Sequence, residues 1–409
     1  MMKRDVIVVG AGPGGATAAA MLARRGVNVL LLDKQRFPRD KVCGDAISGK
    51  SVDALKALGV IDKMPLAQPL DTWGITFSSP AGDQVTIPFT KDFTQPIPPG
   101  YVCPRLTFDR VTFEAAVDSG AEVWQEATVK NMVMDGDRIT GVTVQRKGEK
   151  QVQTIHAPIV IGADGAYSVV VRDLGMTQLD EKHYAGSMRA YYEGVTGFDE
   201  MNSIELHFAD VVIPGYFWIF PLPDGRANVG LGMVSHLMKK HNVKLRPLLD
   251  QLVTHPRFRD RFADAERIGP MKGWGLPLGS KPRPMAGDGW MLVGDAASLI
   301  DPFTGEGIGN AMISAIHAAE WAERALETGA TSAADLKGYG DAVMADLRQE
   351  LKISTMLLRL AQWPTLLNFL IRKASRSTEV ADTISCMFDD MSERRRLLSP
   401  MFYLRLLAA

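Results

Sequence analysis

The segment VIVVGAGPGGATAAAMLARRGVNVLLLD, residues 6–33, decides the fold of this chain. The apolar run at residues 5–9 predicts a strand of a buried parallel sheet. Residues 13–25, rich in Ala, Leu and Met, predict a helix, and residues 27–33 predict the next strand. Together these elements form one βαβ unit, which predicts an α/β fold with a Rossmann-type parallel sheet.

Three glycines in this segment have the spacing Gly-x-Gly-x-x-Gly of a dinucleotide-binding turn. Gly10 allows the tight turn after the strand, Gly12 lets the backbone approach a pyrophosphate, and Gly15 lets the helix pack closely on the strand. Asp33, at the end of the second strand, can accept hydrogen bonds from ribose hydroxyls. Because strand, helix, second strand and acid occur in order, dinucleotide binding is favoured over a glycine-rich turn without a ligand.

Two later segments favour FAD over NAD as the dinucleotide. IVIGADGAYS, residues 159–168, has an Asp-Gly pair directly after a strand, and WMLVGDAASLIDPFTGEGIGNAM, residues 290–312, has Asp295 after another. Asp295 can bind the sugar-alcohol chain of a flavin, and the backbone of residues 305–308 can lie flush against a flat ring. The helix that follows turns its positive dipole end toward that ring. The simpler alternative, a turn followed by a helix cap, does not account for all the segments together.

Composition narrows the function classes. The chain has 409 residues, of which 46% are hydrophobic and 23% charged, and its net charge is −1, so a nucleic-acid partner is not expected. Cys43, Cys103 and Cys386 are far apart and have no zinc-like spacing, so we expect no disulfide framework, no metal site and a reducing, cytoplasmic location. No run of about 20 uncharged apolar residues occurs, so no transmembrane helix is expected.

The remaining periodicity predicts a domain built from discontinuous pieces. We predict an FAD-binding domain from residues 1–70, 100–180 and 275–330, an inserted antiparallel β-sheet substrate domain from 71–99 and 181–274, and a C-terminal helical region from 331–409. The predicted elements are a hairpin at 72–88, a helix at 105–118, a meander at 127–157, an antiparallel sheet at 184–234, a helix at 244–264, a strand at 290–294, a helix at about 307–328, and helices from 333 onward.

Several of these segments also carry a family resemblance. The fingerprint at 10–33, the ADG at 163–165 and the GDAA…GEGI at 294–308 resemble the FAD-dependent aromatic-hydroxylase fold. PRDKVCGD, residues 38–45, resembles the Lys-x-Cys-Gly signature of the geranylgeranyl reductase family, and PGYFWIFPLPDGRANVGLG, residues 214–232, resembles its Tyr-x-Trp-x-Phe-Pro signature. The resemblance covers roughly residues 4–330. One departure is Asp45, which stands where the family often has a second glycine.

The resemblance implies an FAD site and, beside it, a substrate site. The implied cofactor residues are Gly10, Gly12, Pro13, Gly14, Gly15, Asp33, Lys34, Cys43, Gly44, Arg105, Val129, Asp164, Gly165, Gly294, Asp295, Gly305, Gly307 and Ile308. The implied substrate-binding residues are Tyr216, Trp218, Phe220 and Pro302. The implied catalytic residues are Cys43, Asp45, Tyr216 and Trp218.

Alternative roles remain open for the two signature segments. Tyr216, Trp218 and Phe220 alternate along a strand and so share one face, which either packs on a core or forms the wall of a substrate cavity. Cys43 is a small buried filler, a disulfide partner of Cys103 or a residue of the active site. Asp45 either holds a proton for the reaction or caps a helix that begins near residue 48.

The implied activity is reduction of C=C bonds in a polyprenyl lipid, a prenyl pyrophosphate or a prenylquinone. An isolated alkene accepts hydride only if a general acid supplies a proton, and Asp45, Cys43, Tyr216 or an ordered water are the candidates. The chain has no second Gly-x-Gly-x-x-Gly, so the electron donor is NAD(P)H bound transiently or a small redox protein. The rival functions are a flavin monooxygenase or halogenase on the same fold and, as a third class, a flavin carrier without catalysis.

The C-terminal region contains two apolar segments with basic ends. Residues 354–375, STMLLRLAQWPTLLNFLIRKAS, and residues 393–407, ERRRLLSPMFYLRLL, are the segments concerned. One interpretation is helices packed on the catalytic body. The other is a peripheral contact with a membrane, in which basic residues lie at lipid phosphates and apolar side chains lie below them.

Overall fold

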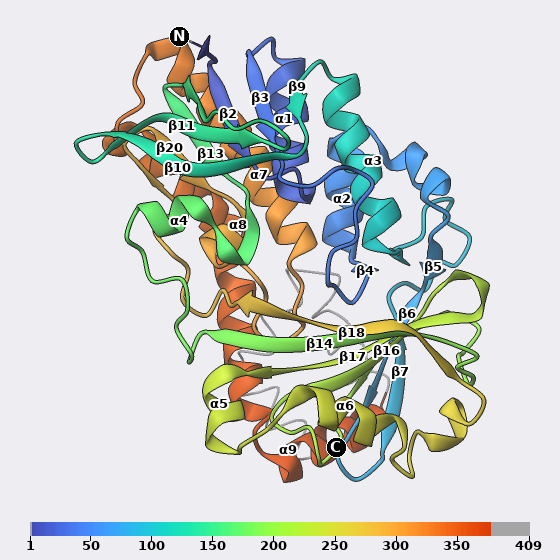
Figure 1. Ribbon diagram of the computed structural model, residues 1–409. Helices are drawn as coiled ribbons and strands as arrows, with labels where there is room; N and C mark the ends of the chain where they lie inside the picture. The colour runs from blue at the N-terminus through green and yellow to red at the C-terminus, as the bar shows by residue number, and fades with distance from the viewer. Residues whose placement is uncertain (1, 378–409) are drawn as a thin grey trace.

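The computed structural model describes residues 2–377, and a six-stranded sheet forms the centre of its upper body (Figure 1). The strand order is β19-β20-β13-β2-β3-β9, and all neighbours pair in parallel except β19. The bounds are β2 Val6–Val9, β3 Val29–Leu32, β9 Glu122–Trp124, β13 Ile159–Gly162, β19 Ala286–Gly287 and β20 Trp290–Leu292. The predicted βαβ unit is confirmed, and the other strands of this sheet come from widely separated parts of the sequence.

Helices and a second layer of strands cover this sheet. The helices α1 and α7 pack against each other, as do α1 and α3, while β11 packs on β13 from a four-stranded sheet of order β1-β12-β11-β10. The apolar strands β2 and β3 are therefore buried on both faces. The bounds are α1 Pro13–Arg24, α3 Arg105–Asp118, α7 Ile308–Thr328, β1 Met2–Lys3, β10 Ala127–Asp135, β11 Arg138–Arg146 and β12 Gln153–His156.

The turn between β2 and α1 needs glycine at two positions. Gly10 has a φ of +98°, and a Cβ atom there would lie 2.5 Å from the carbonyl oxygen of Ala163. A Cβ atom on Gly15 would collide with the carbonyl oxygen of Gly10. The close packing that the sequence predicts for Gly15 is thus present in the structure.

A seven-stranded sheet forms the lower body (Figure 1). Its order is β18-β14-β17-β16-β15-β6-β7, and every pair is antiparallel except β15 and β6. The predicted hairpin at 72–88 therefore joins the predicted antiparallel sheet at 184–234. The bounds are β6 Gly74–Ser78, β7 Gln84–Pro88, β14 Tyr184–Glu193, β15 Ile204–His207, β16 Tyr216–Pro221, β17 Arg226–Val234 and β18 Glu266–Pro277.

The remaining elements are short and lie around these layers. A small three-stranded sheet, β4-β8-β5, follows the first βαβ unit, and α5 and α6 pack on β14 and β17. The bounds are β4 Ala46–Ile47, β5 Leu70–Thr72, β8 Gly100–Val102, α2 Gly49–Ala57, α4 Val169–Asp173, α5 Ser235–Lys240 and α6 Leu245–Val253. The α/β class with a parallel sheet, an antiparallel sheet and C-terminal helices is confirmed, whereas the domain boundaries stay a prediction.

Two predicted elements differ from the structure. The helix at 244–264 ends at Val253 and a 3-10 turn follows at Arg259–Phe262, because Pro256 disfavours helical backbone in the residue before it. The strand at 290–294 ends at Leu292, since Gly294 opens a 3-10 turn with a φ of +57°. The helix α2 is the one that the sequence offers near residue 48 as an alternative role for Asp45.

The C-terminal region forms two helices within the described residues. α8 spans Ala333–Leu360 and begins with a capping box of Ser332 and Asp335, and α9 spans Pro364–Ala374. α9 packs on β7, so the predicted apolar segment at 354–375 lies against the lower body. The second apolar segment, 393–407, lies outside the described residues.

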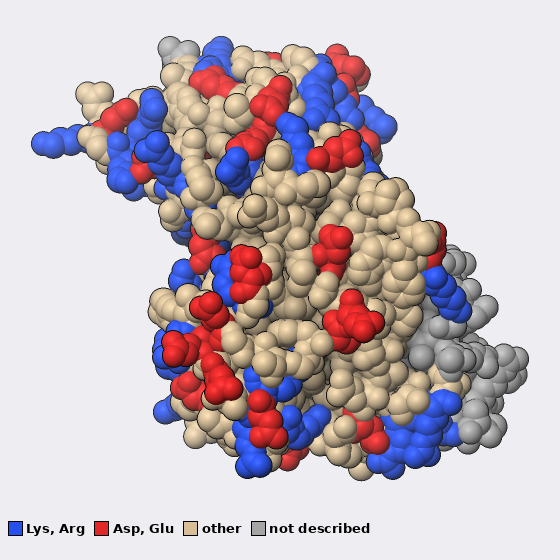
Figure 2. Space-filling model, turned by 90° about the vertical axis from the view of Figure 1, so that its right-hand side faces the viewer, with Lys and Arg blue, Asp and Glu red and all other residues tan. Residues whose placement is uncertain are grey.

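None of the helices described in residues 2–377 is long and apolar enough to cross a membrane. On the face shown in Figure 2, basic and acidic side chains are interspersed on the upper body, and an area without charge crosses the middle. The interspersed charges on this face differ from the basic stripe typical of a nucleic-acid binder.

Candidate active site

A cavity of about 730 Å³ lies between the parallel sheet and the seven-stranded sheet. The parallel sheet and its loops contribute residues that include Gly10, Gly12, Asp33, Lys34, Asp164, Gly294 and Asp295, and β10 of the four-stranded sheet contributes Val129. The seven-stranded sheet and the segments near it contribute residues that include Thr72, Phe89, Ile204, Leu206, Tyr216, Trp218 and Phe220. One continuous cavity therefore joins the predicted dinucleotide turn to the predicted aromatic wall.

Most residues predicted for the site line this cavity. The cofactor candidates among them also include Pro13, Gly14, Cys43, Gly44, Arg105, Gly165, Gly305, Gly307 and Ile308. Three predicted residues do not line the cavity, namely Gly15, Asp45 and Pro302. Gly15 serves the packing of α1 on the turn, and Asp45 is buried behind the cavity wall.

The glycine turn has the features that FAD requires. A Cβ atom on Gly12 would meet only the Arg39 guanidinium, at 3.6 Å, so the N-terminus of α1 opens into the cavity. Asp33 holds the turn, because its carboxylate accepts hydrogen bonds from the backbone N–H groups of Ala11 at 2.8 Å and Gln35 at 2.7 Å. FAD bound here would place its pyrophosphate at the helix N-terminus.

Asp164 supports the same assignment from the neighbouring strand β13. Its Oδ2 accepts a hydrogen bond from the Val169 backbone N–H at 2.6 Å, whereas its buried Oδ1 has no partner in the described part of the chain. Burial raises the pKa of Asp164 above its ordinary value. A buried acceptor that lines the cavity without a partner fits a hydroxyl-bearing ligand such as the ribityl chain or ribose of FAD.

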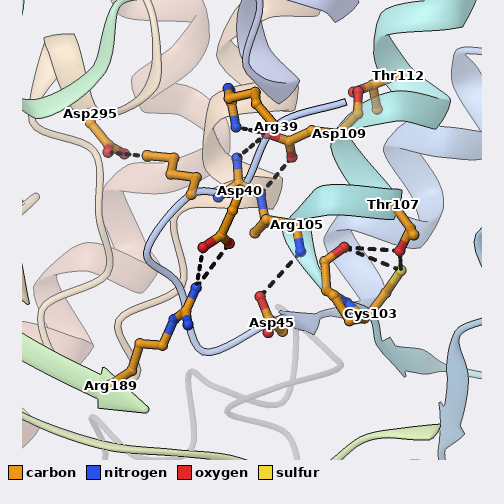
Figure 3. A network of polar contacts seen from close by, with 12 residues as sticks. Arg39, Asp40, Asp45, Cys103, Arg105, Thr107, Asp109, Thr112, Arg189 and Asp295 are labelled. Carbon is orange, nitrogen blue, oxygen red and sulfur yellow. Dashed lines mark hydrogen bonds and ion pairs between the residues drawn. The ribbon is translucent and has the colours of Figure 1, made fainter. Parts of the chain in front are cut away.

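A charged loop at residues 39–41 connects the two sheets through contacts that the sequence does not predict (Figure 3). Asp40 accepts hydrogen bonds from Arg189 of β14 at 2.8 and 2.9 Å and from Lys272 of β18 at 2.7 Å. Burial tends to raise the pKa of Asp40, but Lys272 and Arg189 outweigh it and lower that pKa. Lys41 lies 3.4 Å from Asp295, so this loop binds both bodies through ion pairs.

A second ion-pair group holds the start of α3 beside the same loop. Asp109 is fully buried and contacts two arginines: Arg105 through both of its oxygens, at 2.5 and 2.8 Å, and Arg39 at 2.5 Å. Arg39 and Arg105 both line the cavity. Because a buried carboxylate with two paired arginines is well compensated, this group orients cationic side chains at the cavity wall.

The aromatic strand β16 follows the predicted alternation. Tyr216, Trp218 and Phe220 line the cavity, while Phe217 and Ile219 are fully buried in the core on the other side of the sheet. The indole N–H of Trp218 donates to Oδ1 of Asn228 at 2.9 Å. The aromatic residues therefore form a cavity wall and also pack against one another.

The segment Cys43–Gly44–Asp45 passes close to this aromatic wall. A Cβ atom on Gly44 would lie 2.9 Å from the Phe220 ring, which explains a glycine at this position. Cys43 lines the cavity as a free thiol, and burial raises its pKa, so the thiol is neutral. Cys103 is also free, so no disulfide joins the two.

Asp45 lies in a closed hydrogen-bond network. Its Oδ2 accepts from the Tyr191 hydroxyl at 2.7 Å and from the Asn228 amide at 2.8 Å, and its Oδ1 accepts from the Arg105 backbone N–H at 3.3 Å. It does not cap α2, whose N-cap is Ser48. The side chain of Asp45 thus binds the loop to β14 and β17.

Asp45 is expected to make folding stability depend on pH. Burial raises its pKa from 3.8 to about 6, although Tyr191 and Asn228 lower it. Since the folded pKa is raised, the contribution to the free energy of unfolding is present at pH 4 and is lost as the pH rises through 6. The difference corresponds to about 3 kcal/mol. Chemical unfolding of the parent and Asp45→Asn at pH 4 to 7 should show the parent losing its relative advantage, and parallel curves would contradict this.

Two sequence models match the chain. The model of the FAD binding domain matches residues 3–203, and the model of the geranylgeranyl reductase catalytic domain matches residues 187–264. Digeranylgeranylglycerophospholipid reductase 2 of Methanopyrus kandleri is 36% identical over 343 residues, which are 83% of this chain and 82% of that protein. The chain belongs to the geranylgeranyl reductase family. Members of this family are FAD-dependent oxidoreductases, and the cofactor predicted from the sequence is confirmed as FAD.

Another relative is similar in sequence, and solved structures share the fold. The menaquinone reductase of Mycolicibacterium smegmatis is 34% identical over 317 residues, 75% of this chain and 73% of that protein. A geranylgeranyl bacteriochlorophyll reductase-like protein from Thermoplasma acidophilum has the same fold, with a TM-score of 0.81 at 24% identity over 97% of this chain and 99% of that one. A flavin-dependent brominase shares the fold at a TM-score of 0.76, 21% identity and 95% of each chain.

Proposed function

We propose that this member of the geranylgeranyl reductase family saturates C=C bonds of a polyprenyl chain. The observation that carries the proposal is one continuous cavity that runs from the FAD-binding turn to the aromatic wall of β16. Apolar area buried there contributes about 25 cal/mol per Å² to binding of an isoprenoid chain. A cationic centre that develops on the chain is stabilised by the aromatic faces by about 0.5–2 kcal/mol.

Some residues of this chain would bind the alkene, and another would protonate it. Reduced FAD supplies hydride when it is bound. Tyr216, Trp218 and Phe220 would hold the apolar chain and exclude water, and Cys43 and Gly44 would border the reacting part of the cavity. One alkene carbon must receive a proton from a group within hydrogen-bond reach.

The three side chains first considered as proton donors are poor candidates. The Tyr216 hydroxyl donates to the carbonyl oxygen of Thr304 at 2.7 Å, and burial raises its pKa. The raised pKa of Cys43 makes the thiol a weak acid. Asp45 does not line the cavity, and its hydrogen-bond partners are donors. A different acid is therefore required, or an ordered water.

The names of the relatives give two substrate classes, a digeranylgeranyl glycerophospholipid and a menaquinone. We propose that the substrate belongs to these prenyl classes or is a prenyl pyrophosphate. NAD(P)H or a small redox protein would supply electrons. Because the substrate is a lipid, we expect a cytoplasmic protein in peripheral contact with a membrane. Among the described elements, α9 is the one most similar to a membrane-contacting amphipathic helix.

The rival functions use the same fold. A halogenase would be expected to carry Trp-x-Trp-x-Ile-Pro on the strand that here reads Tyr216-x-Trp218-x-Phe220-Pro221. No motif of this sequence distinguishes a hydroxylase from a reductase, so the reaction product has to be identified to separate these two functions. A flavin carrier without catalysis does not explain a cavity that extends past the FAD site to an aromatic wall.

The enzyme is expected to turn over without oxygen. Purified protein with reduced flavin is incubated anaerobically with a digeranylgeranyl glycerophospholipid or a menaquinone. The molecular mass of the product is then measured by mass spectrometry. Reduction adds two hydrogens for each saturated bond, because each alkene carbon gains one. A product that appears only with oxygen and gains one oxygen atom would move the protein to the monooxygenases.

A further inference from the structure

A cluster of carboxyl groups lines the cavity next to the start of α7. Glu306 lies in the loop before that helix, Glu350 lies on α8, and both line the cavity together with Lys50 of α2. Asp301, five residues before Glu306, is fully buried beside them. Three carboxyl groups therefore share one ammonium group.

The hydrogen bonds of this cluster are unequal. Lys50 donates to Oε1 of Glu350 at 2.6 Å and to the side-chain oxygen of Asn310 at 2.8 Å. Oδ1 of Asp301 accepts from the Thr304 backbone N–H at 2.8 Å, among other donors of that loop, whereas its buried Oδ2 has no hydrogen-bond partner in the described part. Glu306 accepts the Gly309 backbone N–H at 2.7 Å on Oε1.

The charges of this cluster favour a bound proton. If all three carboxyls were ionised, the cluster would carry a net charge of −2 with Lys50 included, which is unfavourable where burial leaves charge poorly solvated. Burial raises the pKa of Glu306 and of Asp301, and the negative charge of Glu350 raises that of Asp301 further. Each rise favours the neutral form of its acid, so this cluster holds a proton more readily than three exposed carboxyl groups would.

Glu306 is the member of the cluster best placed to use that proton. Asp301 does not line the cavity, and Glu350 is paired with Lys50. Glu306 lies between Gly305 and Gly307, and a Cβ atom on Gly305 would lie 2.9 Å from the Tyr216 hydroxyl, so the loop adjoins the aromatic wall.

The other cavity-lining carboxyls are committed elsewhere. Asp40 and Asp295 are paired with cations, and Asp33 and Asp164 belong to the dinucleotide turn and to β13. Glu306 forms no ion pair among the described residues: its Oε1 accepts the Gly309 backbone N–H, and burial raises its pKa, although Lys50 and the Ser48 hydroxyl lower it. Glu306 is thus a cavity-lining acid in a loop that adjoins the aromatic wall.

We propose that Glu306 is the general acid that protonates the alkene, an inference that rests on the proposed reductase function. One alkene carbon accepts hydride, with both electrons, and the other accepts the proton of Glu306. The π bond breaks, two C–H bonds form, and Glu306 becomes a carboxylate that Lys50 and the Gly309 N–H stabilise. Solvent protons return to Glu306 through the cluster after product leaves.

The first test measures the proton and needs no substrate. Infrared spectra of the FAD-bound protein at pH 7 are compared for the parent, Glu306→Gln and Asp45→Asn. The parent should show the C=O stretching band of a neutral carboxyl group, and that band should be lost in Glu306→Gln and retained in Asp45→Asn. A band that persists unchanged in Glu306→Gln would overturn the assignment, whether or not the protein reduces prenyl lipids.

The second test measures the proton transfer. In anaerobic single turnovers of prereduced protein, Glu306→Gln should lower the rate about 10²–10⁴-fold while the flavin content stays near that of the parent. The parent rate should fall as the pH rises through the pKa of Glu306, and this dependence should be absent in Glu306→Gln. Asp45, Cys43 and Asp301 also titrate near the site, so an unchanged profile in Glu306→Gln assigns it to one of them and overturns the proposal.

A conservative variant covers the case in which Glu306→Gln loses flavin. Glu306→Asp keeps the acid but withdraws it from the cavity, and it should recover part of the rate with a shifted pH profile. A rate and a profile equal to those of the parent would overturn the proposal. If the parent itself reduces no prenyl lipid, the proposed function fails, and the infrared result still decides whether Glu306 holds the proton.

Discussion

Gly12→Val is expected to abolish FAD binding while the chain remains folded. The backbone of Gly12 has φ −67° and ψ −178°, an extended conformation that valine adopts readily. The nearest heavy atom to a Cβ at this position is the Arg39 guanidinium at 3.6 Å, so the protein itself has room for the side chain. That room is the part of the cavity at the N-terminus of α1, where the pyrophosphate would lie.

Flavin absorbance of the purified variant measures this expectation, and circular dichroism reports the fold. Gly15→Val is the matched control, because its Cβ would collide with the Gly10 carbonyl and should disrupt the turn and the fold together. Purified Gly12→Val protein with a full complement of FAD would remove the assignment of this turn as the pyrophosphate site.

The parts of the site that the sequence predicts come from short, continuous segments. The βαβ unit needs only residues 6–33, and the shared face of Tyr216 and Trp218 follows from the period of a strand. Each of these features depends on spacing within one segment. They are therefore visible in the sequence before any tertiary contact is known.

The parts that the sequence does not predict join residues that are far apart along the chain. Asp40 and Arg189 are separated by 149 residues, and Lys50 and Glu350 by 300. Lone charged residues at such distances give no pattern in a single sequence. Asp45 has a further reason, because its φ of +69° turns the side chain behind the cavity wall, and that backbone conformation is not predicted for a non-glycine residue.

The charged loop at 39–41 and the segment 43–45 together place the two bodies around the cavity. Asp40 holds β14 and β18, and Asp45 holds β14 and β17 through Tyr191 and Asn228. Asn228 also donates to the carbonyl oxygen of Cys43 at 2.8 Å. The position of Cys43 at the cavity thus depends on the same network that orients Trp218.

Trp218→Ala is expected to lower turnover by about 100-fold with much less effect on flavin content. Trp218 is 7% exposed, lines the cavity, and is tied to Asn228 by its indole N–H. Removing the ring widens the cavity, admits water and releases Asn228 from one of its partners. A displacement of about 1 Å in the reacting groups is enough to cost about 10² in rate.

Phe217→Ala is the matched control on the same strand, because Phe217 is fully buried on the opposite face and packs on Phe258 at 5.1 Å between ring centres. It should lower the free energy of unfolding by about 3–5 kcal/mol and leave turnover per folded, FAD-bound molecule near that of the parent. If Trp218→Ala behaves in the same way, with a large loss of stability and unchanged turnover, then Trp218 serves the core and the aromatic face of β16 is not the substrate wall.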